Sequence, residues 1–233
     1  MLNKVSLGLA AGAAFLFAQT AAHAADVTPP KPAPKNNTLS LEFSPEWDAS
    51  SKNQGLKDDY LKFGLSHSFD NNFVVGGSWQ HTWRVGPPVY TGIKAYSTAE
   101  QVEASLGYKI KNGPFTLTPS VVLGYGFGDV PDINPALTPG SGSATDPELY
   151  YAASIAGDYK LSDNLTWNVF NARYRNAFSV TWITPKVSTG LTYKIDGSNS
   201  VYANVGYAWK DKGDGKGLQP DKLNLAVGYK LAF

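Results

Sequence analysis

The sequence predicts an all-β fold, a closed antiparallel up-and-down transmembrane β-barrel of ten strands. Three observations support this prediction. Apolar and polar residues alternate in ten separate stretches between Thr38 and Phe233, which is the period of a strand with one buried and one polar face. The connections between stretches are short at one end of the barrel and longer at the other, an asymmetry typical of barrels that cross a membrane. A signal for secretion precedes the first stretch.

Composition narrows the class of protein further. The chain has 233 residues, with 20 Lys and Arg against 19 Asp and Glu, and it has no cysteine. Balanced charge does not favour binding to nucleic acid, which requires an excess of basic residues. Without cysteine there is no disulfide framework and no thiolate metal ligand. After the first 18 residues no apolar run approaches the roughly 20 residues of a membrane helix. We therefore expect no nucleic-acid partner, no cofactor and no metal site.

The N-terminal 37 residues are predicted to form two segments that precede the barrel. Residues 1–24 form a signal peptide, with a positive charge at Lys4, an apolar run over 5–18 and the small-x-small cleavage site Ala22-His23-Ala24. Residues 25–37 contain four prolines, a composition typical of an extended linker. We expect this linker to lie in the periplasm and the barrel to occupy residues 38–233.

The first five strands follow directly from the alternation. In the first of them, Leu39, Leu41 and Phe43 share one face while Ser40 and Glu42 share the other. Each later strand repeats this arrangement, so every strand presents one apolar face to lipid and one polar face to the lumen. The predicted strands are Thr38–Ala49, Tyr60–Phe69, Phe73–Arg84, Thr98–Ile110 and Phe115–Phe127.

The second half of the chain continues the pattern with one irregularity. Within the seventh strand the alternation changes phase between Val169 and Phe170, for which a β-bulge is the simplest explanation. The remaining strands need no correction. The predicted strands are Leu149–Leu161, Leu165–Tyr174, Ile183–Ile195, Val201–Trp209 and Leu223–Phe233.

The connections set the strand number and the orientation. Short turns rich in Asn, Asp, Gly and Ser occupy 70–72, 111–114, 162–164 and 196–200, whereas the connections at the other end are longer, over 49–55, 85–95, 128–147, 176–180 and 211–220. Short periplasmic turns and longer extracellular loops place both termini in the periplasm. A soluble sandwich would also alternate, but the secretion signal and the aromatic strand ends favour the membrane barrel. Eight or twelve strands would require merging two strands or splitting 128–147.

The C-terminus supplies the most specific resemblance. Phe233 ends the chain and is preceded at alternate positions by Leu231, Tyr229, Val227 and Leu225. In this ending, and in its alternation from Thr38 onward, the sequence resembles the Gram-negative outer-membrane β-barrel proteins of the small porin-like class. The resemblance implies an outer-membrane location, contact with lipid and lipopolysaccharide, and insertion by the barrel-assembly machinery. It also implies that Phe233, Leu231 and Tyr229 form the assembly signal.

A search for catalytic groups yields no candidate. His67 and His81 lie by parity on the outward face, and His23 leaves with the signal peptide. Asp58 and Asp59 are adjacent near the outer end of the second strand. Neighbours in a strand point to opposite faces, so the two carboxylates cannot act as a pair. A histidine paired with an acid at an outer cleft is not visible. We therefore predict no enzymatic activity and keep an outer-membrane enzyme as the weakest alternative.

Charged residues on the inward positions are the candidate functional residues. Ten strands leave a lumen only slightly wider than the eight-stranded barrels that side chains fill. In one interpretation small residues leave a narrow porin-like channel for ions or small solutes. In the other, the charges pair across the lumen and the barrel is a non-conducting scaffold that displays surface loops for adhesion or envelope integrity. The inward charges are Glu42, Glu46, Lys62, Arg84, Glu103, Asp158, Arg173, Arg175, Lys186 and Lys210.

Four lysines recur at equivalent positions near the periplasmic end. Lys109, Lys160, Lys194 and Lys230 each follow an outward tyrosine, so parity turns all four inward. We expect them to form a partial ring of positive charge at the periplasmic mouth, where a narrow pore would favour anions. The alternative is that they extend past the rim to water and lipid headgroups and set only the depth of the barrel.

Overall fold

The computed structural model describes residues 35–49, 55–90, 93–127, 148–178, 183–211 and 215–233. The predicted signal peptide, most of the linker and the connection 128–147 lie outside the described residues. Asn36–Phe233 forms one compact unit. Among the described residues, no helix is long and apolar enough to cross a membrane.

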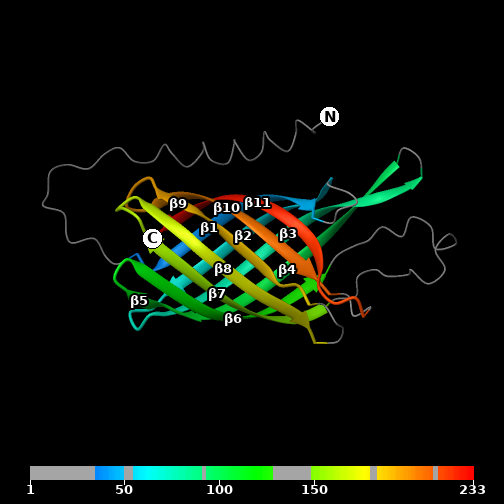
Figure 1. Ribbon diagram of the computed structural model, residues 1–233. Helices are drawn as coiled ribbons and strands as arrows, with labels where there is room; N and C mark the ends of the chain where they lie inside the picture. Colours follow the sequence, from blue (N-terminus) through cyan, green and yellow to red (C-terminus); the bar gives the residue numbers. More distant parts are fainter. Residues whose placement is uncertain (1–34, 50–54, 91–92, 128–147, 179–182, 212–214) are drawn as a thin grey trace, which may run out of the picture. The chain divides into compact units, whose positions relative to one another are not determined.

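The unit is a single antiparallel sheet that closes on itself (Figure 1). Sheet neighbours follow one another along the chain, as in an up-and-down barrel, and β1 pairs with β11. The strands are β1 (Asn37–Asp48), β2 (Leu56–Ser68), β3 (Phe73–Tyr90), β4 (Ile93–Tyr108), β5 (Ile110–Asn112), β6 (Phe115–Phe127), β7 (Glu148–Lys160), β8 (Leu165–Ala177), β9 (Lys186–Lys194), β10 (Asn199–Lys210) and β11 (Gln219–Ala232).

The short strand β5 does not add an eleventh position to the barrel. Both β4 and β5 pair with β6, in the same register on either side of Lys109. That register places Tyr108 opposite Pro119, which has no amide hydrogen to donate to the ladder. Strands β4 and β5 are therefore two parts of one barrel strand, and the predicted number of ten is confirmed.

Pairing of the first and last strands closes the barrel. The register joins Leu39 to Leu231 and Leu41 to Tyr229. Beyond the last pair, the amide of Phe233 donates to Asn37 O at 3.0 Å and the amide of Asn37 donates to Phe233 O at 3.1 Å. Closure removes the two free sheet edges, which is the condition for placing strands in lipid.

The outer surface of the barrel is apolar. The exposed fraction reaches 59% for Val121, 54% for Leu65 and 51% for Val205, on three strands far apart in the sheet. Many other large apolar side chains are exposed at alternate positions of the remaining strands. So much apolar surface would be costly in water, whereas it is the surface that a barrel in lipid presents. The predicted alternation is therefore confirmed.

Short turns gather at one end of the barrel, which we call the turn end, together with the C-terminus (Figure 1). Gly113 and Asn72 have positive φ there, at 57° and 68°, the left-handed backbone that these residue types tolerate. The prediction was wrong in two places at the opposite end. Strands β3 and β4 continue through most of the predicted connection 85–95 as a two-stranded ribbon (Figure 1). Ile183 makes only an isolated bridge to Asp211, so β9 begins at Lys186.

The predicted β-bulge in β8 is confirmed. Against β7, the register shifts where Gly157 faces Phe170 and Asp158 faces Asn168, which leaves Val169 without a partner. Against β9, the shift falls between Asn168 and Asn171. The extra residue explains why the apolar positions change parity in the middle of this strand.

Deleting Phe233 should reduce assembly more than stability. The deletion removes the last two backbone hydrogen bonds between β1 and β11, each of which contributes about 1 kcal/mol net. We expect the free energy of unfolding of refolded barrel to fall by about 2 kcal/mol at most, while the folded fraction in cells falls several-fold. The unboiled band on detergent gels measures the folded fraction. Wild-type levels of folded protein after the deletion would contradict the assembly role.

Candidate functional site in the barrel lumen

Glycines on the inner wall lie opposite larger side chains of neighbouring strands. Gly124 on β6 is the register partner of Tyr150 on β7, and Gly228 on β11 is the partner of Tyr202 on β10. A Cβ at Gly124 would lie 2.2 Å from Cζ of Tyr150, and a Cβ at Gly228 would lie 2.3 Å from Cζ of Tyr202. Each tyrosine therefore lies across a strand that has no side chain in its way. Asn204 uses Gly190 in the same manner.

Glu103 is the centre of a hydrogen-bonded cluster that crosses the lumen. One carboxylate oxygen accepts from Arg173 at 2.5 Å and from the Tyr150 hydroxyl at 2.8 Å. The other accepts from Lys62 at 3.1 Å and from the Ser78 hydroxyl at 3.3 Å. Glu103 lies on β4, and its partners come from β2, β3, β7 and β8. Of these strands only β3 is a sheet neighbour of β4, so the partners on the other three strands meet Glu103 through the lumen. We call these five residues the Glu103 cluster.

Arg175 extends the Glu103 cluster toward the end of the barrel that lies opposite the turn end. Its guanidinium lies over the Tyr150 ring, 5.4 Å from the ring centre, and its Nε donates to the Thr184 hydroxyl at 2.8 Å. Arg173 and Arg175 are two residues apart on β8, so they face the same part of the lumen. The carboxylate of Glu103 is bonded to Arg173. The side chain of Glu103 is only 10% exposed, so its charge is desolvated and depends on these partners.

A second carboxylate, that of Glu42 on β1, organises the wall on both sides of its strand. Glu42 accepts hydrogen bonds from the hydroxyls of Tyr60 at 2.7 Å and Tyr202 at 2.8 Å. The ammonium of Lys230 lies 4.6 Å from the centre of the Tyr202 ring, and that of Lys186 lies 5.9 Å from the centre of the Tyr60 ring. Tyrosines thus place cations and a carboxylate in one network by cation–π contacts and hydrogen bonds.

A third cluster lies toward the end opposite the turns. Lys222 on β11 bonds Glu46 on β1 at 2.6 Å and also pairs with Asp58 on β2. Because β1 separates β2 from β11, this lysine joins three adjacent strands on the inner wall. Lys57 and Asp221 form a further ion pair at 2.7 Å. All three clusters consist of oppositely charged groups brought together from distant parts of the sequence.

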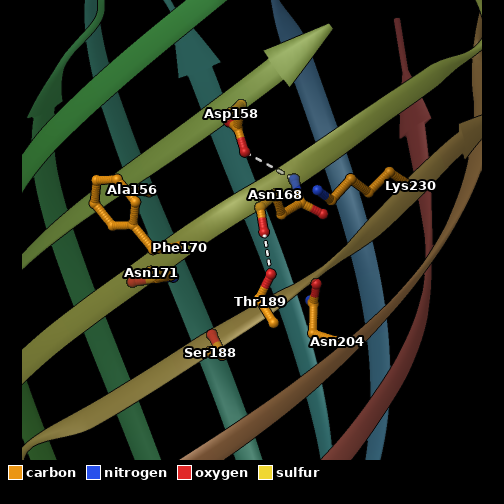
Figure 2. Close-up of a pocket in the computed structure, with 9 residues that line it drawn as sticks. All are labelled: Ala156, Asp158, Asn168, Phe170, Asn171, Ser188, Thr189, Asn204 and Lys230. Atoms are coloured by element: carbon orange, nitrogen blue, oxygen red, sulfur yellow. Dashed lines mark hydrogen bonds between the residues drawn. The ribbon is translucent and has the colours of Figure 1, made fainter. Parts of the chain in front are cut away.

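A cavity of about 180 Å³ opens on the inner wall beside the β8 bulge (Figure 2). Asn168 donates to the Asp158 carboxylate at 2.8 Å and accepts from the Thr192 hydroxyl at 3.0 Å. The Thr189 hydroxyl donates to the backbone carbonyl of Asn168 at 2.9 Å, which satisfies an acceptor beside the bulge. The polar residues that line the cavity are Asp158, Asn168, Asn171, Ser188, Thr189, Asn204 and Lys230.

The four predicted ring lysines have different surroundings at the turn end. Lys109 donates to the Ser68 hydroxyl at 2.8 Å, and Lys230 lies deeper, on the Tyr202 ring. Lys194 is exposed. Lys160 is half-exposed and bonds Asp163 in the adjacent turn at 2.6 Å. That hydrogen bond and the positive charge of Lys160 lower the pKa of Asp163. The structure therefore does not gather the four ammonium groups into one set of equivalent positions.

The remaining predicted lumen residues are placed less fully. Arg84 on β3 is the register partner of Asp58 on β2, and the side chain of Arg84 lies outside the described part of the chain. Lys210 ends β10 after a register shift between Ala208 and Trp209. Sequence reasoning did not assign Tyr150, Tyr202 or Lys222 to the site. Parity could have found them, since each shares the even positions of the inward residues on its strand.

An outward-facing histidine has an acidic partner that the sequence analysis did not identify. His81 pairs with Glu100 on β4, its register partner, and its ring contacts Trp83 at a centroid distance of 4.4 Å. Trp79 and Trp83 on the same face are 39% and 41% exposed, so the pair lies on the outer surface and not in the lumen. In the described part of the chain no group of histidine and acidic residues could hold a metal ion.

Comparisons with known proteins identify the fold. No family model matches the sequence, and no curated protein matches it. The structure is similar to the β domain of the Bordetella autotransporter BrkA, with 9% identity, a TM-score of 0.51, and coverage of 85% of this chain and 99% of that one. The fold is that of an outer-membrane β-barrel. The translocator domain of the autotransporter NalP from Neisseria meningitidis (12% identity, TM-score 0.46, 85% and 88% covered) and the KdgM porin (16%, 0.42, 84% and 99%) are further similar structures.

Replacing Gly124 by alanine should disrupt the Glu103 cluster. The added methyl group would overlap the Tyr150 ring, so the ring must move and its hydrogen bond to Glu103 is lost. We expect a loss of about 1–3 kcal/mol in the free energy of unfolding, the usual cost of overpacking, measured by urea unfolding of the refolded barrel.

Gly126 provides the matched control, because a Cβ there would meet its nearest heavy atoms at 3.9 Å. Gly126→Ala should leave the free energy of unfolding within about 0.5 kcal/mol of wild type. Equal effects of the two substitutions would contradict the proposed role of Gly124.

Proposed function

We propose that this protein is an outer-membrane barrel that forms a narrow channel for ions or small solutes. The observation that carries the proposal is the contrast between an apolar outer surface and a lumen lined by charged side chains from most strands. A barrel that served only as a membrane anchor would not need charges on so many inward positions, since burying each of them costs free energy unless it is paired.

The Glu103 cluster is the proposed constriction. It joins Lys62 and Arg173 across the lumen at one level, and ions passing this level would meet two cations and one carboxylate at close range. Rings and pairs of charges of this kind select ions in narrow pores. The excess of positive charge at this level favours anions, in the same direction as the predicted lysine ring.

The same cluster is the specific observation in favour of the second candidate. Four partners hold Glu103, and a lumen tied together in this way could be closed to solutes. The protein would then be a structural barrel that displays its extracellular loops, and the ribbon of β3 and β4 would extend that display surface (Figure 1).

Location and biogenesis belong to the proposal as well. The barrel would be exported through cleavage of residues 1–24, inserted by the barrel-assembly machinery through Phe233, Leu231 and Tyr229, and surrounded by lipid and lipopolysaccharide. The turn end would then face the periplasm. The exposed apolar side chains of the outer surface support insertion into lipid, and the exposed Phe233 at the end of that surface is accessible for recognition.

Conductance in planar bilayers tests the channel and its constriction together. Glu103→Gln removes the countercharge of Lys62 and Arg173, and a unit charge 4 Å from an ion is worth about 1 kcal/mol even in water. We therefore expect the permeability ratio of chloride to potassium to rise several-fold, measured as the reversal potential across a KCl gradient. Asp70→Asn, in the exposed turn between β2 and β3, should leave the ratio unchanged.

Two results would contradict these expectations. Bilayers that contain folded wild-type barrel and show no steps above leak would remove the channel and favour the display barrel. A conducting barrel whose ion preference is the same in wild type and Glu103→Gln would place the constriction elsewhere.

The proposed contribution of the lysines is tested by single substitutions. The ammonium group of Lys109 donates to a neutral partner, the Ser68 hydroxyl. Lys109→Gln should therefore lower anion preference. Lys160 is already neutralised by Asp163, so Lys160→Gln should change the reversal potential much less. Equal effects of both substitutions would contradict the neutralisation of Lys160 by Asp163, and cation preference in wild type would contradict a contribution of these lysines to ion preference.

A further inference from the structure

The β8 bulge brings two amide side chains to the same side of the barrel wall. Without it, residues that share a face would be two apart along the strand. The extra residue instead lets Asn168 and Asn171 both face the lumen, where both line the cavity (Figure 2). Asn168 meets the inward Asp158, and the inward position after Asn171 is Arg173 in the Glu103 cluster. Bulges commonly direct side chains in this way beside functional sites.

Neighbouring strands complete a polar recess around the two amides. Ser188 on β9, Asn204 on β10 and Lys230 on β11 line the same cavity. Asn204 reaches it by lying across Gly190, where a Cβ would be 2.1 Å from its side-chain oxygen. The β8 bulge and Gly190 therefore determine where the recess lies, because the strand pairing around them is otherwise regular.

The groups in the recess balance one another in charge. Asp158 contributes one negative charge and Lys230 one positive charge, while three amides and the Ser188 hydroxyl supply both donors and acceptors. An anion or a cation would find one like-charged group beside its partner. A neutral solute with several hydroxyl groups would find a donor or an acceptor for each of them. The volume of about 180 Å³ equals about six water molecules at about 30 Å³ each, which accommodates a molecule the size of a monosaccharide.

We propose that this recess is a binding site for a neutral polyhydroxylated solute of monosaccharide size. The proposal deepens the channel function and rests on it, since the solute would reach the site through the lumen. Asn168 and Asp158 are held in place by their mutual hydrogen bond and by Thr192, so these acceptors are oriented before the solute arrives. Asn171 is exposed to the lumen and supplies the most accessible amide.

Equilibrium binding of D-glucose to folded barrel in detergent micelles tests the site. Saturation-transfer NMR over a glucose titration gives the dissociation constant without requiring conduction. We expect Asn171→Leu to weaken binding by about fivefold or more, the factor that corresponds to one lost hydrogen bond. Ser188→Ala, a smaller change, should also weaken binding and serves if Asn171→Leu does not fold. The heat-dependent gel shift verifies folding of each variant.

Gln80→Leu is the matched control. Gln80 is an inward amide on β3, outside the cavity, and bonds Thr82. Its substitution should leave the dissociation constant of glucose unchanged. Absence of glucose binding to wild type, equal weakening by Gln80→Leu and Asn171→Leu, or binding of the zwitterion L-serine in place of glucose would each overturn the proposal.

Conductance separates this proposal from the one on which it rests. A conducting wild-type barrel without glucose binding overturns the solute site and leaves the channel intact. Glucose binding that Asn171→Leu weakens, in a barrel that shows no conductance, supports the site and overturns the channel.

Discussion

Closure of the backbone ladder between β1 and β11 is the constraint on which the rest of the structure depends. Lipid offers no hydrogen-bond partner, so every strand needs a neighbour on both sides. The reciprocal bonds between Asn37 and Phe233 complete this ladder at the turn end. Once the sheet is closed, every second side chain must face a narrow lumen. The chemistry of the interior follows from that geometry.

A narrow lumen requires its large side chains to lie along the wall. Tyr150 and Tyr202 do so because their register partners are Gly124 and Gly228. Their hydroxyls then reach carboxylates that would otherwise be desolvated without partners, and cations settle on their rings. Glycines, tyrosines and ion pairs therefore act together in filling the narrow lumen. The glycine makes space, the tyrosine fills it, and the ion pairs offset the cost of buried charge.

The interior is not uniform along the barrel. Toward the end opposite the turns, Lys222 holds Glu46 and Asp58 together, and the Glu103 cluster spans the lumen. Beside the β8 bulge the wall instead opens into a polar recess. A regular ladder would give the same spacing of side chains everywhere, so the bulge is the feature that separates the polar recess from a wall of paired charges.

The sequence by itself determined the fold, the strand number, the bulge in β8 and which side chains face outward, because a strand alternates with a period of two whatever its neighbours are. It did not determine which side chains contact one another in the lumen. The contacts of Glu103 with Arg173 and of Glu42 with Tyr202 depend on how strands are staggered around a closed barrel. Stagger is a property of the whole sheet, so partners 70 residues apart become visible only in the tertiary structure.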